Sequence, residues 1–153
     1  MSRLETKVPP VIWWAWGALV VLFVDVSFGD SLAVGWGRVA GIILLGAGVV
    51  VALMAFGAFR EAQTTFDPHN VSQASTLITD GIYKFTRNPM YLGLMLLLIG
   101  WGLWRGTIAG AILGAIVFGA LITRMQIVPE ERVLAEKFGD EFEAFTAQTR
   151  RWI

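Results

Sequence analysis

Residues 81–104 read GIYKFTRNPMYLGLMLLLIGWGLW, a polar and aromatic segment that runs directly into a long apolar stretch. The segment holds both tyrosines of the chain, with Arg87 and Asn88 between them, and Pro89 suits the first turn of a helix. Packing alone does not require a polar aromatic loop at the point where a chain enters a membrane. The stretch therefore predicts a membrane helix from residue 89 and a small-molecule site at its polar end.

Composition supports residence in a membrane. The chain has 153 residues, 56% of them hydrophobic, a mean hydropathy of +0.63 and only 16% charged residues. Soluble domains carry about a quarter charged residues, and this length allows one compact bundle. A formal net charge of zero gives no basis for binding nucleic acid. Without cysteine and with a single histidine, the chain offers no thiolate nucleophile and no metal site.

Two long apolar runs precede the quoted stretch, and residues 11–28 and 39–59 are each long enough to cross a bilayer. Two shorter runs of about 15 residues follow, which predicts a helical hairpin over residues 89–122. Its second helix either ends there or continues through Gln126. The expected fold is therefore an all-α integral membrane protein with about four membrane helices. Gly106, Gly110 and Gly114 recur every fourth residue and predict close helix contact.

The remaining segments complete a single membrane domain, residues 1–153. The polar connection over residues 60–88 is too long for an idle loop. From Pro129 a helix is expected within residues 129–153, because four apolar residues recur at helical spacing on a charged background: Leu134, Phe138, Phe142 and Phe145. Such an amphipathic helix either lies along the membrane surface or caps the bundle.

Basic residues divide unequally between the two ends of the predicted bundle. Only Arg38 and Arg105 fall at one end, and the other ten of the 12 fall at the opposite end: Arg3, Lys7, Arg60, Lys84, Arg87, Arg124, Arg132, Lys137, Arg150 and Arg151. Cytoplasmic loops are rich in lysine and arginine. Both termini and the 60–88 loop are therefore expected in the cytoplasm, at the inner membrane if the source is bacterial.

An antiparallel hairpin returns the chain to its starting side, so polar residues before and after it meet. The residues concerned are Asp80, Tyr83, Arg87, Asn88, Tyr91, Arg124, Gln126, Glu130 and Glu131. Each has an alternative interpretation: acids favour a helix start, tyrosines form interfacial belts, and arginines set topology. Their convergence nevertheless predicts a pocket open to both cytosol and lipid.

Two motifs carry a resemblance to a known family. Leu77–Tyr83 with Arg87–Gly93, and then Glu130-Glu131 followed by Phe138-Gly139 and Arg151-Trp152-Ile153, resemble the isoprenylcysteine carboxyl methyltransferase family. Membrane phospholipid methyltransferases share the pattern more loosely. The resemblance extends from about Phe56 to the C-terminus. Its order and spacing across a hairpin are more specific than a lone Asn-Pro-x-Tyr.

This family consists of integral-membrane enzymes that use S-adenosylmethionine without a Rossmann domain. The resemblance implies cofactor contacts from Ser75, Thr76, Leu77, Ile78, Tyr83, Asn88, Pro89, Met90, Tyr91 and Glu130. It implies catalytic roles for Arg124 and Glu131, and substrate contacts from Arg87 and Gln126. Many members have histidine at the position of Asn88. Asparagine retains hydrogen bonding there, but no proton transfer can be assigned to it.

The expected activity is S-adenosylmethionine-dependent methyl transfer to a lipophilic or lipid-modified acceptor. A carboxylate of the isoprenylcysteine type is favoured because Arg124 or Arg87 could bind it, and a small isoprenoid acid is a related possibility. A phospholipid amine is the alternative, with Glu130 or Glu131 as the base. The non-enzymatic alternative is a membrane scaffold or accessory protein without catalytic activity. Transport is disfavoured, because the spans carry no central charge pair and no visible inverted repeat.

Overall fold

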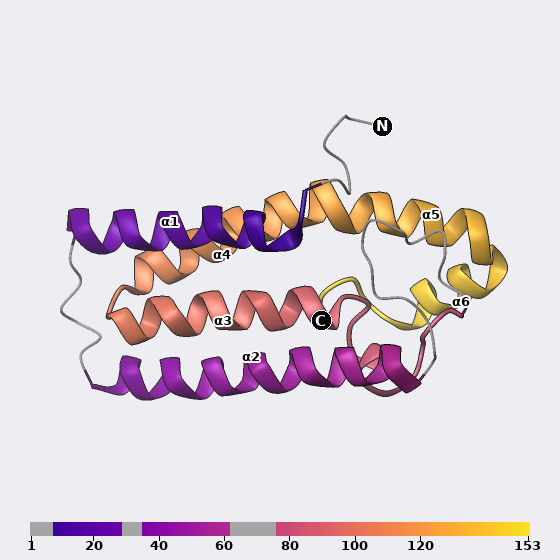
Figure 1. Ribbon diagram of the computed structural model, residues 1–153, viewed down its shortest axis with the longest axis horizontal. Helices are drawn as coiled ribbons and strands as arrows, with labels where there is room; N and C mark the ends of the chain where they lie inside the picture. The colour runs from indigo at the N-terminus through magenta and orange to yellow at the C-terminus, as the bar shows by residue number, and fades with distance from the viewer. Residues whose placement is uncertain (1–7, 29–34, 62–75) are drawn as a thin grey trace.

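The computed structural model describes residues 8–28, 35–61 and 76–153, and these ranges contain helices and no strand (Figure 1). Its helices are α1 (Pro10–Phe28), α2 (Trp36–Glu61), α3 (Pro89–Arg105), α4 (Ile108–Ile122), α5 (Val128–Phe138) and α6 (Asp140–Gln148). A 3-10 turn, η3 (Gly81–Lys84), precedes α3, and a π turn, η4 (Thr123–Ile127), joins α4 to α5. The predicted all-α membrane fold is confirmed.

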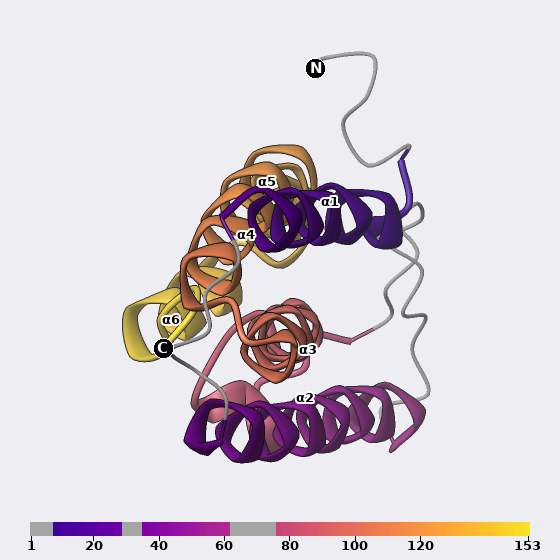
Figure 2. The ribbon, with the colours of Figure 1, turned by 90° about the vertical axis from the view of Figure 1, so that its left-hand side faces the viewer.

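The long helices lie side by side, with α3 between α2 on one side and α1 with α4 on the other (Figures 1 and 2). Within the described ranges, three stretches are long and apolar enough to cross a membrane: Pro10–Ser27, Trp36–Glu61 and Ile108–Phe138. The hairpin helix α3 has 17 residues. It spans ~26 Å, a little less than a hydrocarbon core of ~30 Å.

Glycines let these helices approach closely. A Cβ built on Gly48 of α2 would lie 2.8 Å from the carbonyl oxygen of Gly93 in α3, and one on Gly17 of α1 would lie 2.9 Å from that of Gly114 in α4. The predicted glycine face of the second hairpin helix therefore exists, but Gly114 faces α1 rather than the hairpin partner. Gly106 has another function, because its φ of 91° ends α3 in the left-handed region that favours glycine.

One interaction joins helices at the end of the bundle away from the quoted polar segment. Arg105 at the end of α3 donates from Nε to Asp25 Oδ2 of α1 over 2.9 Å. Next to it, Thr107 caps α4 by accepting a hydrogen bond from the Gly110 amide over 3.1 Å. The first contact ties α3 to α1, and the second starts α4 directly after the turn of the hairpin.

The C-terminal region departs from the single helix predicted over residues 129–153. The second hairpin helix continues through η4 into α5, the longer of its two expected forms. The chain then breaks at Gly139, whose φ of 48° lies in a region open to glycine, and α6 turns back. Phe142 and Phe145 are buried against Leu77 and Tyr83, so the apolar stripe covers the end of the bundle.

Candidate functional site

The loop before α3 presents a buried tyrosine. Tyr83 lies in η3 with 8% of its surface exposed, and its ring meets that of Phe59 in α2 edge-on at 6.1 Å. Leu77 and the two phenylalanines of α6 complete the apolar surroundings. Burial raises the pKa of the Tyr83 phenol above its ordinary value of 10.0, and the nearby Glu130 carboxylate raises it further. This phenol therefore stays protonated and lies within electrostatic reach of Glu130.

Glu130 and Tyr91 join the two halves of the site. Tyr91 lies two residues after Pro89 in the first turn of α3. It is 6% exposed and donates from Oη to Glu130 Oε1 over 2.5 Å. Pro89 fixes the start of α3 at a position where a missing N–H costs nothing. A buried carboxylate is costly unless it is hydrogen-bonded, and Tyr91 supplies that bond. The Glu130 acid and the Tyr91 phenol thus meet at one end of the bundle, with the Tyr83 phenol within electrostatic reach.

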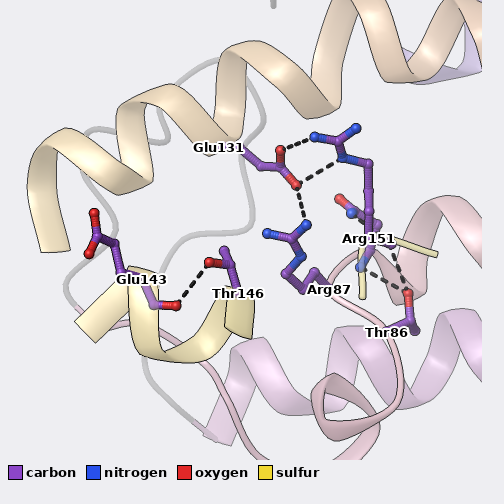
Figure 3. Close-up of polar contacts among 7 residues, drawn as sticks. Thr86, Arg87, Glu131, Glu143, Thr146 and Arg151 are labelled. Atoms are coloured by element: carbon purple, nitrogen blue, oxygen red, sulfur yellow. Dashed lines mark hydrogen bonds and ion pairs between the residues drawn. The ribbon is translucent and has the colours of Figure 1, made fainter. Parts of the chain in front are cut away.

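Glu131, one residue further along α5, is held by two arginines (Figure 3). Arg151 donates from Nε to Oε1 over 3.1 Å and from Nη2 to Oε2 over 2.6 Å. Arg87 approaches Oε1 with Nη2 at 3.3 Å. The bond with Glu131 raises the pKa of Arg151, so this guanidinium stays charged. The adjacent acids therefore have different partners, a phenol for Glu130 and two cations for Glu131.

The C-terminal tail is bound along its backbone to the loop before α3. The Arg87 amide donates to the Arg150 carbonyl over 3.0 Å. The Arg151 carbonyl accepts from Asn88 Nδ2 over 2.9 Å and from Thr86 Oγ1 over 3.3 Å. Because the Asn88 amide nitrogen makes this bond, its Oδ1 is the atom left to accept another. Asn88 is thus oriented by the tail, and this is a contact the sequence did not reveal.

The other predicted site residues occupy varied positions. Arg124 is exposed on η4, whereas Gln126 is fully buried and donates from Nε2 to the Val8 carbonyl. Leu77 and Pro89 are buried, Ile78 and Met90 are half-buried, and Thr76 is exposed. Ser75 lies outside the described residues. The structure therefore brings Tyr91 and Glu130 into contact with Tyr83 within electrostatic reach, whereas Arg124 is exposed.

Two groups that the sequence did not assign to the site emerge from the structure. Thr86 is 1% exposed, and its Oγ1 also accepts from the Asn88 backbone N–H over 3.2 Å. Arg151, which the sequence suggested only as part of a terminal motif, contacts both Glu131 oxygens. In residues 8–28, 35–61 and 76–153 no three acidic or histidine side chains are grouped as a metal site.

A hydrogen-bonded acid and tyrosine at one end of an all-helical bundle define the class of the protein, a helical membrane protein with a polar site at the end of its helices. The comparisons with known proteins narrow this class. The phospholipid methyltransferase family matches residues 36–141, and this chain belongs to that family. Membership of this family confirms the resemblance that the two sequence motifs carry.

Two relatives show how far the similarity extends. An uncharacterized protein of Haemophilus influenzae is 45% identical over 64 residues, which are 42% of this chain and 100% of that protein. The protein-S-isoprenylcysteine O-methyltransferase of Schizosaccharomyces pombe is 32% identical over 69 residues, 45% of this chain. This second match spans only 29% of the yeast protein. No solved structure matches the chain.

Proposed function

We propose that this protein transfers a methyl group from S-adenosylmethionine to a lipophilic acceptor that reaches the site from the bilayer. The observation that carries the proposal is the 2.5 Å hydrogen bond between Tyr91 Oη and Glu130 Oε1. It joins the polar segment before the hairpin to the acids after it, with Tyr83 close by. Membership of a methyltransferase family supports the reaction class.

The residues of the site fit the chemical groups of this methyl donor. S-adenosylmethionine carries a sulfonium and an ammonium group, both cations. Glu130 is hydrogen-bonded by a phenol, whereas the charge of Glu131 is offset by two arginines. Glu130 is therefore the acid available to a cation. The rings of Tyr83 and Tyr91 can add attraction of ~0.5–2 kcal/mol each.

When bound, the donor supplies a methyl carbon that an acceptor atom attacks as the carbon–sulfur bond breaks and its electron pair stays on sulfur. The chain's own contribution is alignment and exclusion of water. Holding two reactants in line can supply ~7–11 kcal/mol of a barrier. No covalent nucleophile is needed, which agrees with a chain that has no cysteine.

A carboxylate acceptor is favoured by Arg87. Its Nη2 contacts Glu131, while its buried Nε has no hydrogen-bond partner within the part of the chain that the structure describes. Arg124, the other sequence candidate, is exposed. We therefore assign the carboxylate contact to Arg87. The name of the yeast relative supports an isoprenylcysteine-like acceptor, and a small isoprenoid acid would present the same group.

A phospholipid amine is the second candidate acceptor, supported by the description of the family. An ammonium group must lose a proton before it can attack, and Glu130 is the acid positioned to accept it. The two candidates differ in the group they require, a cation at Arg87 or a base at Glu130. A non-catalytic scaffold, the remaining possibility, would bind neither donor nor acceptor.

We propose that the site faces the cytoplasm, in a protein whose termini both lie on that side. Val8 accepts a hydrogen bond from Gln126, so the described N-terminal end lies beside η4. Arg87, Glu131 and Arg151 gather at this end, and Arg105 lies at the opposite end of α3. The positive-inside rule supports the cytoplasmic assignment of the end with more basic residues.

The test begins with S-adenosylhomocysteine, the product of the donor, titrated against the purified protein in mild detergent. Ligand at ~100 times its Kd should raise the free energy of unfolding by ~2.7 kcal/mol. Tyr91→Phe and Glu130→Gln should reduce this stabilisation, and Glu136→Gln, an exposed acid of the same helix, should preserve it. Absence of any stabilisation in folded wild-type protein would favour the scaffold.

Labelled methyl transfer then separates the acceptors. An N-acylated S-prenylcysteine, a long isoprenoid acid and vesicles containing phosphatidylethanolamine are offered in parallel. Label in the first two supports the carboxylate assignment. Label in the vesicles alone supports the amine.

A further inference from the structure

The two arginines that contact Glu131 differ in the number of contacts they make with it. Arg151 uses two nitrogens on both carboxylate oxygens, at 3.1 and 2.6 Å. Arg87 makes one contact, at 3.3 Å. The two-point contact of Arg151 is the stronger, because paired N–H donors match the two oxygens of a carboxylate. Arg151 is therefore the main partner of Glu131, and Arg87 is the lesser one.

We propose that Arg151 is a positioning residue: it pairs with Glu131, so that the guanidinium of Arg87 stays available to the carboxylate of the acceptor. The inference rests on the proposed function in its carboxylate form. It assigns to the C-terminal tail a part in recognition of the acceptor, acting through Glu131 and Arg87.

Charge and burial support this role. Arg87, Glu131 and Arg151 together carry one positive charge in excess. The Arg87 side chain is 14% exposed and that of Arg151 is 39% exposed, so water screens Arg151 more than Arg87. The Arg87 backbone is fixed by its bond to the Arg150 carbonyl, and its Nε is buried without a described partner. A largely buried cation with a spare donor is suited to an incoming anion.

The tail is anchored independently of the Arg151 side chain. Its carbonyl accepts from Asn88 and Thr86, and Trp152 packs against the core formed by α1, α3 and α4. A substitution of the Arg151 side chain keeps these backbone contacts. The effect of its guanidinium can therefore be measured without removing the tail.

The test compares two substitutions that should shift the KM for the prenylcysteine probe in opposite directions. In Arg151→Met, Glu131 has only Arg87 as a partner, so the KM for the prenylcysteine probe should rise at least tenfold. In Glu131→Gln, Arg87 loses its competitor, so this KM should fall about twofold or more. The double variant should return to within about threefold of wild type. Both single variants break the same ion pair, so a merely structural role would shift both KM values in the same direction.

Controls separate this inference from the proposed function. Arg150→Gln removes a neighbouring exposed arginine side chain while preserving its backbone carbonyl, and should leave the KM unchanged. The affinity for S-adenosylhomocysteine should stay within about threefold of wild type in every variant. If Arg151→Met does not fold, Arg151→Lys, which offers one donor point instead of a planar pair, should raise the KM at least threefold.

Two results would overturn the inference while the methyltransferase assignment stands. One is a KM that rises in both single variants, or in neither, in a wild type that methylates the carboxylate probe. The other is a wild type that binds S-adenosylhomocysteine but methylates no carboxylate probe, which removes the carboxylate assignment as well. Failure to bind S-adenosylhomocysteine at all would instead end the proposed function.

Discussion

Removing one oxygen atom from Tyr91 should test the central contact of the site. The Tyr91 hydroxyl is buried and donates to the Glu130 carboxylate over 2.5 Å. An acid that loses its buried hydrogen-bond donor bears a desolvation cost of ~1–3 kcal/mol. Tyr91→Phe should therefore lower the free energy of unfolding by ~1–3 kcal/mol. The ring and its packing are unchanged by this substitution.

The assay is equilibrium unfolding in mixed micelles of dodecyl maltoside and dodecyl sulfate, run as a double-mutant cycle. Glu130→Met keeps the length of the side chain and removes the acceptor. In that background Tyr91→Phe should cost nothing, because the phenol has no carboxylate to bond. The other tyrosine of the chain is the comparison: Tyr83→Phe should cost less than Tyr91→Phe, because Tyr83 senses Glu130 through its charge, whereas Tyr91 is hydrogen-bonded to it.

Equal costs of Tyr91→Phe in the wild-type and Glu130→Met backgrounds would refute the reasoning. Such a result would mean that the two groups are not energetically coupled, whatever their distance. The proposal that Glu130 is oriented by Tyr91 for a cationic ligand would then lose its main support.

Three further predictions concern other parts of the molecule. Gly48→Ala should lower the free energy of unfolding by ~1–3 kcal/mol, because its Cβ would lie 2.8 Å from a backbone oxygen of α3, whereas Gly46→Ala, with nothing within 4 Å, should raise it by up to ~1 kcal/mol. Asn88→Asp should cost ~1–3 kcal/mol by removing the donor to the Arg151 carbonyl, and Asn88→His, which keeps an N–H, should cost less in thermal unfolding. Since the pKa of Tyr83 is raised in the folded state, the unfolded state loses this proton first as pH rises past 10.0. Wild-type stability measured from pH 8 to 11 should therefore fall more steeply than that of Tyr83→Phe.

The membrane helices could be predicted from the sequence because bilayer thickness requires long apolar runs. The C-terminal break could not. Leu134, Phe138, Phe142 and Phe145 continue at helical spacing across Gly139, and a glycine within a periodic pattern is compatible with either a helix or a turn. The break is set by tertiary packing, since folding α6 back buries Phe142 and Phe145 against Tyr83.

The site was predicted in part for a related reason. Tyr91 and Glu130 were placed together by the hairpin argument, which needs only the ends of two antiparallel helices. The π turn at Thr123–Ile127 holds an extra residue per turn, so the face of each later side chain cannot be counted at 3.6 residues per turn. Within this turn Arg124 is exposed and Gln126 is buried. The contacts of the tail go to backbone carbonyls, which any residue provides and no pattern reveals.

Neighbouring acids can serve different purposes because a helix turns by 100° from one residue to the next. Glu130 faces the start of α3 and meets a phenol, and Glu131 faces the tail and meets two arginines. Without the arginines, two carboxylates side by side would repel each other and each would favour protonation of the other. Pairing Glu131 with cations therefore reduces the repulsion that Glu130 experiences. The difference between the two acids arises from the C-terminal tail, because the stronger contact to Glu131 comes from Arg151.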